Sequence, residues 1–146
     1  MADSQQQVVQ RIAMKAVIVN DAGEVLILRE ASTYDEGTNT GRYHMPGGRL
    51  NPGEPFLDGL SREVMEETGL TVSVERPLYV GEWFPVIKGV PNQIVAVFFV
   101  CKAAAGEVRL SEEHDDFQWI SADDAAKYDL MDPEDKVLRE YFTAAA

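Results

Sequence analysis

The sequence contains little cysteine, little histidine and few basic residues. Its 146 residues include one cysteine, two histidines, and 13 lysines and arginines against 25 aspartates and glutamates, for a formal net charge of −12. A single cysteine excludes a disulfide framework within the chain, and because Cys101 lies in an apolar run we expect a buried, unreactive thiol. The acidic excess argues against binding to a nucleic acid polymer, which requires a basic surface.

Long apolar runs, low-complexity tracts and internal repeats are also absent. The longest apolar run, residues 94–101, is far shorter than the roughly 20 residues that span a bilayer. The N-terminal sequence MADSQQQVVQ is polar and lacks the basic-then-apolar pattern of a signal peptide. We therefore expect a cytoplasmic protein with no membrane partner, folded as a single domain over residues 1–146.

The pattern of apolar residues predicts strands before and after one central helix. Two β-rich runs flank the turn sequence NDAG and predict a hairpin, and a later, almost continuously apolar run is typical of a central strand. These features predict an α/β or α+β fold with a mixed sheet. The expected strands are residues 13–20, 24–30, 71–84, 92–103 and 117–121, the expected helices are 55–68 and one or two within 122–142, and 31–42 is expected to be a loop.

Three glutamates lie close together on one face of the helix predicted over residues 55–68. Glu63, Glu66 and Glu67 occupy positions i, i+3 and i+4, where like charges cost a few tenths of a kcal/mol per pair. Either water screens these carboxylates or a cation lies among them. An acidic site can bind phosphates when a divalent metal bridges the two, since the charge of the metal then dominates.

The residues around these glutamates form a longer motif. Residues 48–70, GRLNPGEPFLDGLSREVMEETGL, place a glycine, a glutamate, an Arg-Glu pair, a Glu-Glu pair and a final Gly-Leu at fixed spacings. The motif resembles the Nudix box, the signature of the Nudix hydrolases, at every defined position. The run YHMPGG that leads into it is also similar to that family, with tyrosine where tryptophan is frequent. The resemblance implies a Nudix-type α/β/α sandwich with a mixed β-sheet, in which the box forms a loop and a helix.

The same resemblance implies a magnesium site, for which manganese can substitute. Glu63 and Glu67 would be the principal ligands, Glu66 would be a further ligand, and Gly47 would offer its backbone carbonyl. Magnesium requires octahedral oxygen ligands, and carboxylates on one helix face supply them. All three glutamates are therefore also candidate catalytic residues, because the bound metal would position water and neutralise phosphate charge.

Other residues of the motif are implied to have structural roles. Gly48 would permit a tight loop, and Gly69 would end the helix. Arg62 would pair with Glu54 and hold the loop against the helix. The alternative for this pair is an ordinary surface ion pair, worth less than about 1 kcal/mol.

The acidic stretch SEEHDD, residues 111–116, offers one more candidate ligand. Members of the family often recruit a carboxylate near the end of the sheet as a ligand or general base, and similar members place a glutamate directly before a histidine. We therefore expect Glu113 to be a metal ligand and a catalytic residue, and His114 to be a loop histidine without a catalytic role. The alternative is that every carboxylate of this stretch faces solvent.

Three residues outside the motif are candidates for substrate binding. Arg29, placed after a predicted strand, and Arg42, placed before the Pro-Gly-Gly turn, could reach substrate phosphates. Trp83 could stack on a nucleobase. The alternatives are ordinary surface arginines and a core tryptophan.

The resemblance predicts a magnesium-dependent pyrophosphohydrolase, acting as a monomer or homodimer on a nucleoside diphosphate linked to another group. The short chain favours nucleoside triphosphates, which would give a nucleoside monophosphate and pyrophosphate. One alternative is an ADP-ribose or nucleotide-sugar pyrophosphatase, since such enzymes often carry a proline some way beyond the box, as Pro85 lies here. A second is a nucleotide-sensing module without catalysis, although such proteins commonly lose box glutamates and none is lost here.

Overall fold

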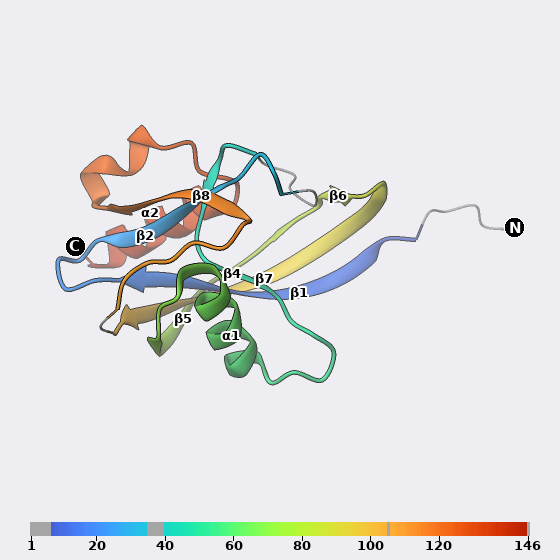
Figure 1. Cartoon of the computed structure of the whole chain (residues 1–146), viewed down its shortest axis with the longest axis horizontal. Helices are drawn as coiled ribbons and strands as arrows, with labels where there is room; N and C mark the ends of the chain where they lie inside the picture. The colour runs from blue at the N-terminus through green and yellow to red at the C-terminus, as the bar shows by residue number, and fades with distance from the viewer. Residues whose placement is uncertain (1–6, 35–39, 105, 146) are drawn as a thin grey trace, which may run out of the picture.

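The computed structural model describes residues 7–34, 40–104 and 106–145 (Figure 1). Residues 1–6, which belong to the segment expected not to be a signal peptide, lie outside the described residues. In chain order the elements are β1 (Val9–Val19), β2 (Val25–Glu30), β3 (Tyr43–His44), β4 (Gly47–Arg49), α1 (Phe56–Thr68), β5 (Val72–Trp83), β6 (Val86–Ile87), β7 (Val90–Ala103), β8 (His114–Ile120), a 3₁₀ helix (Ala122–Lys127) and α2 (Glu134–Ala145).

The strands form one mixed sheet whose main path runs β3-β2-β1-β7-β5. β1 and β7 are parallel along the whole of β1, whereas the other strand pairs of the described residues are antiparallel. β4 pairs with β1, β6 with β7 and β8 with β2. The predicted hairpin of β1 and β2 and the predicted central position of β7 are confirmed.

The sheet is covered on both faces because alternate residues of β1 enter two different cores. Odd-numbered core residues of β1 pack with α2, and even-numbered ones pack with α1. Figure 1 shows the two helices on opposite sides of β1. The predicted α/β/α sandwich is thus confirmed. The α2 side includes Ala13, Val17, Val137 and Leu138, and the α1 side includes Met14, Ala16, Ile18, Leu60 and Val64.

The predicted helix that carries the three glutamates is confirmed as α1. It starts after Pro55 and is followed by Gly69, whose φ of 72° is left-handed and whose N–H donates a hydrogen bond to the Met65 carbonyl. Leu60 and Val64 are fully buried against the sheet. This packing fixes which face of α1 is left for the acidic side chains.

The last predicted strand begins earlier than expected. β8 starts at His114 because Glu30 of β2 pairs with it, across a bulge that follows the Arg29–Asp116 pair. The expectation that His114 lies in a loop is therefore wrong. Apolar alternation alone could not reveal this start, since the first residues of β8 are polar.

Two expectations drawn from composition can also be compared with the fold. Cys101 is fully buried, as expected, and burial raises the pKa of its thiol to about 12, which disfavours the nucleophilic thiolate. Among the described residues, no helix is both long and apolar enough to cross a membrane.

Gly47 should tolerate no side chain. Its φ is 135°, and a Cβ there would lie 2.2 Å from the Met14 carbonyl oxygen and 2.6 Å from the Lys15 Cα. Gly47→Ala should therefore add an overpacking cost of about 1–3 kcal/mol to the cost of a positive φ. Gly23→Ala is the matched control, because Gly23 also has a positive φ but faces open space. Urea unfolding should show a clearly larger loss for Gly47→Ala, and equal losses would contradict the close approach of β4 to β1.

Candidate functional site

A cavity of about 460 Å³ lies where β1, the turn between β3 and β4, α1, the start of β8 and the start of α2 meet. Its lining includes a group of glutamates, called the acidic wall below, a lysine with two histidines, called the polar floor, and apolar side chains. The lining residues that matter for chemistry are Lys15, His44, Gly47, Gly48, Glu63, Glu67, Trp83, Glu113, His114 and Glu134.

The acidic wall is built around Glu67, which is only 5% exposed. Its Oε1 accepts a hydrogen bond of 2.9 Å from the Gly47 N–H, so the first residue of β4 holds this carboxylate in place. Burial raises the pKa of Glu67 well above its ordinary value, and the nearby charges of Glu63 and Glu113 act in the same direction. The charge of Lys15 and the Gly47 hydrogen bond oppose this rise.

Glu63 lies one helical turn before Glu67 and also faces the cavity. Burial is the main cause that raises the pKa of Glu63, opposed by Arg62. Its carboxylate lies so close to the backbone that a Cβ on Gly48 would be 2.7 Å from it. A glycine at this position therefore leaves the space that the Glu63 carboxylate occupies.

The donor set fits a divalent cation. Oxygens of Glu67 and Glu113 lie within 4.8 Å of each other and of a His114 nitrogen, and the Glu63 carboxylate belongs to a residue that lines the same cavity. Clustered, partly buried carboxylates repel one another and are disfavoured in the charged form, so a cation would stabilise them. Carboxylate oxygens are the ligands that suit magnesium and manganese.

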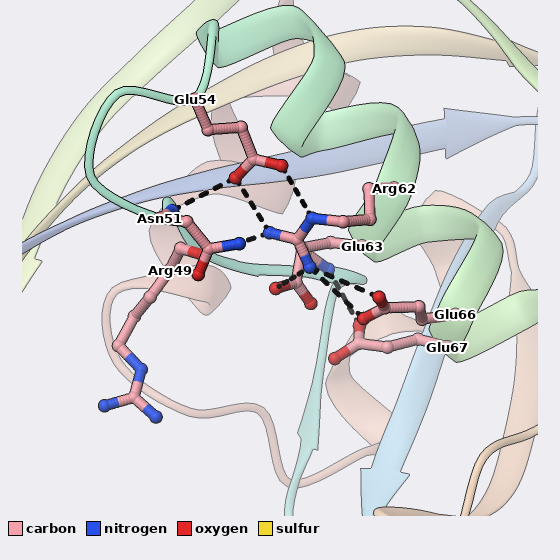
Figure 2. A network of polar contacts seen from close by, with 8 residues as sticks. Arg49, Asn51, Glu54, Arg62, Glu63, Glu66 and Glu67 are labelled. Carbon is pink, nitrogen blue, oxygen red and sulfur yellow. Dashed lines mark hydrogen bonds and ion pairs between the residues drawn. The ribbon is translucent and has the colours of Figure 1, made fainter.

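Arg62 connects the loop of the motif to α1 (Figure 2). Its guanidinium donates to both oxygens of Glu54, at 2.7 Å and 2.9 Å, and also reaches Glu63 at 3.1 Å. Glu54 additionally accepts the Asn51 N–H at 3.0 Å. The hydrogen bonds from Arg62 lower the pKa of Glu54 to about 2. The loop is thereby fixed by a two-pronged pair rather than by a single surface contact.

Glu66 is more exposed than the other two glutamates of α1 and lies outside the described lining of the cavity. Its side chain is 57% exposed, it pairs with Arg62 at 3.3 Å, and it is outside the set of described residues that line the cavity. Figure 2 shows it on the Arg62 side of the helix, next to Glu67. Its role as a further metal ligand stays a prediction.

The two arginines proposed for substrate binding lie away from the cavity lining. Arg29 lies within β2, inside the strand expected over residues 24–30, and pairs with Asp115 at 2.6 Å. Arg42 pairs with Asp129 at 3.2 Å and donates to the Leu130 carbonyl at 3.0 Å. These contacts hold surface segments together, and a role in phosphate binding stays a prediction for both.

Trp83 lines the cavity and is partly buried against the core on the α2 side. It therefore combines the two alternatives that its sequence position suggested. The indole offers an apolar surface at the site, as base stacking would require.

The polar floor was missed by sequence reasoning. Lys15 is 4% exposed, forms an ion pair of 3.4 Å with Glu134, and lies 2.9 Å from His44 Nδ1. His44 Nε2 in turn lies 2.7 Å from His114 Nε2. Glu134 also accepts the Met45 N–H, which ties the start of α2 to the turn before β4. One signal was present, since a lone lysine interrupts the apolar run of β1.

Comparisons with known proteins agree with this geometry. Residues 9–142 match the NUDIX domain family. The MutT-like protein of Streptomyces ambofaciens is 34% identical over 116 residues, covering 80% of this chain and 67% of that protein. The nucleoside triphosphatase NudI of Escherichia fergusonii is 30% identical over 131 residues, covering 83% and 89%. The crystal structure of the MutT protein from Methanosarcina mazei Go1 has a TM-score of 0.78 at 28% identity, covering 96% of this chain and 95% of that one. Because the family match spans nearly the whole chain and the box lies on the wall of a carboxylate-lined cavity, the protein belongs to the Nudix hydrolases.

Proposed function

We propose that this hydrolase is a magnesium-dependent pyrophosphohydrolase that converts a nucleoside triphosphate to a nucleoside monophosphate and pyrophosphate. The observation that carries the proposal is the carboxylate cluster of Glu63, Glu67 and Glu113 on one wall of the cavity. A polyphosphate cannot approach three carboxylates without a cation between them. Magnesium, or manganese in its place, would supply that charge and activate a water molecule.

The chain's own residues hold this arrangement in place. The Gly47 N–H orients Glu67, and Arg62 fixes the loop and contacts Glu63. Glu113, at the end of the cluster, can serve as a ligand or accept the proton of the attacking water. In the reaction, the water oxygen bonds to phosphorus, the bond from that phosphorus to the bridging oxygen breaks, and one proton is released.

Two features support a triphosphate substrate. The relative named nucleoside triphosphatase NudI aligns over most of both chains. The same cavity is also lined by an aromatic side chain, Trp83, on which a base could stack while the phosphates bind at the carboxylates. ADP-ribose or a nucleotide sugar is the second candidate, because Pro85 lines the cavity beside Trp83.

Hydrolysis should be detected on a panel of nucleotides. The panel contains canonical and oxidised nucleoside triphosphates, ADP-ribose, other nucleotide sugars and dinucleoside polyphosphates, each with and without magnesium. We expect magnesium-dependent release of monophosphate and pyrophosphate from at least one triphosphate. Preference for ADP-ribose would select the second candidate. If all substrates stay intact while one raises the unfolding temperature, the protein is a nucleotide-sensing module.

Glu67→Gln should separate metal binding from folding. The amide removes a buried charge but keeps an oxygen for the Gly47 N–H. The pKa of Glu67 is higher in the folded than in the unfolded state. As the pH rises through the folded-state pKa, the buried carboxyl ionises and the folded state loses stability. In EDTA above that pH the variant should therefore unfold at the same temperature as the wild type or higher. Magnesium should raise the unfolding temperature of the wild type only, and turnover should fall at least ~100-fold. Wild-type turnover by the variant would refute the placement of the metal at Glu67.

Glu113→Gln and Glu112→Gln form a matched pair of neighbouring substitutions. Glu113 lines the cavity, whereas Glu112 is exposed and lies outside its described lining. We expect Glu113→Gln to lower kcat by about 10- to 100-fold, as loss of a metal-supporting carboxylate does, and Glu112→Gln to leave it unchanged. Equal kcat values for the two variants would remove Glu113 from the catalytic residues.

A further inference from the structure

The polar floor of the cavity contains a buried nitrogen atom that makes no hydrogen bond among the described residues. His114 is 6% exposed, and its Nδ1 has no hydrogen-bond partner among the described residues. The residue lines the cavity next to Glu67 and Glu113. A buried donor or acceptor without a partner costs about 1–3 kcal/mol, so such an atom indicates a ligand that is bound during function.

The hydrogen bonds behind His114 determine whether Nδ1 is a donor or an acceptor. An ammonium group has three donors and no acceptor, so at 2.9 Å Lys15 must donate to His44 Nδ1. The single proton of a neutral His44 ring then lies on Nε2 and is donated to His114 Nε2 at 2.7 Å. His114 Nε2 is thus an acceptor, and the proton of its ring must lie on Nδ1.

The same contacts require both rings to be neutral. Each ring has one nitrogen that accepts a hydrogen bond, His44 Nδ1 from Lys15 and His114 Nε2 from His44, so its proton lies on the other nitrogen.

The fold keeps this chain of hydrogen bonds rigid. His44 lies on β3 and His114 on β8, and both strands pair with β2, where Leu28 and Glu30 are their partners. The two imidazole rings stack with centroids 4.8 Å apart and planes inclined by 29°. Lys15 is held at the other end by its ion pair with Glu134.

We propose that Lys15 and His44 fix the tautomer of His114 so that its Nδ1–H donates a hydrogen bond to a phosphate oxygen of the substrate. The identity of the acceptor rests on the proposed function, whereas the tautomer follows from the contacts of the protein alone. In this tautomer the Nδ1–H is a donor and offers no lone pair to a metal, so we assign the cation to the carboxylate oxygens. Lys15 and His44 are positioning residues in this account.

The tautomer can be measured directly, because the chain contains only two histidines. In protein labelled with ¹⁵N-histidine, long-range proton–nitrogen correlation spectra distinguish protonated from unprotonated ring nitrogens. Without ligand at neutral pH, we expect Nε2–H for His44 and Nδ1–H for His114, with His114→Asn used to assign the remaining ring. An Nε2–H or doubly protonated His114 would overturn the proposal. This result does not depend on any activity, so it fails or succeeds separately from the nucleotide panel.

The ligand of His114 can be identified with two probes. Magnesium pyrophosphate should shift the Nδ1 and Hδ1 resonances of His114 and leave the proton on Nδ1. Zn²⁺ alone is the second probe, because zinc binds imidazole readily. Loss of the Nδ1 proton with Zn²⁺, or no shift with magnesium pyrophosphate, would overturn the proposed donor role.

Kinetics of two substitutions provide an independent measurement. His114→Ala removes the donor and should raise KM for the best substrate at least about tenfold, as loss of a hydrogen bond to a charged group does. His114→Asn places an amide N–H near the position of Nδ1 and should restore most of that loss. Unfolding temperatures monitor the packing of both variants. Equal KM values for Ala and Asn in folded proteins would contradict a donor role.

Discussion

The buried ammonium group of Lys15 holds together the two halves of the site. It forms the ion pair with Glu134, donates to His44, and its charge opposes the rise in the pKa of Glu67. Its backbone pairs with Gly47, whose N–H orients Glu67. Removing one partner of such a buried pair typically costs about 3–5 kcal/mol because the other charge is left uncompensated. The start of α2, the turn before β4 and the acidic wall therefore depend on one side chain.

The acidic wall is costly for the folded protein in the absence of a cation. Glu63 and Glu67 both have pKa values raised by burial, and Glu113 adds to the repulsion. Arg62 neutralises part of this charge from the outer side of α1 and simultaneously holds the loop through Glu54. On the inner side Glu63, Glu67 and Glu113 still repel one another, which is the arrangement that a cation and a polyphosphate together can satisfy.

Local sequence patterns predicted the parts of the molecule that depend on local structure. The helix of the motif and the shared facing of Glu63 and Glu67 follow from local periodicity and a spacing of four residues, and the helix end follows from Gly69. The polar floor could not be predicted in this way, since His44 and His114 are 70 positions apart and meet only because β3 and β8 both pair with β2. Sequence also could not distinguish Glu66 from Glu67, whose different exposure is set by how α1 packs on the sheet.

The most direct test of this account is a crystal structure of the wild-type protein soaked with Mn²⁺, with anomalous scattering used to locate the metal. We expect anomalous peaks among the carboxylates of Glu63, Glu67 and Glu113, with the His114 ring outside the coordination sphere. A metal ligated by His114, or a peak at Glu66 on the outer side of α1 with none in the cavity, would contradict the arrangement described above.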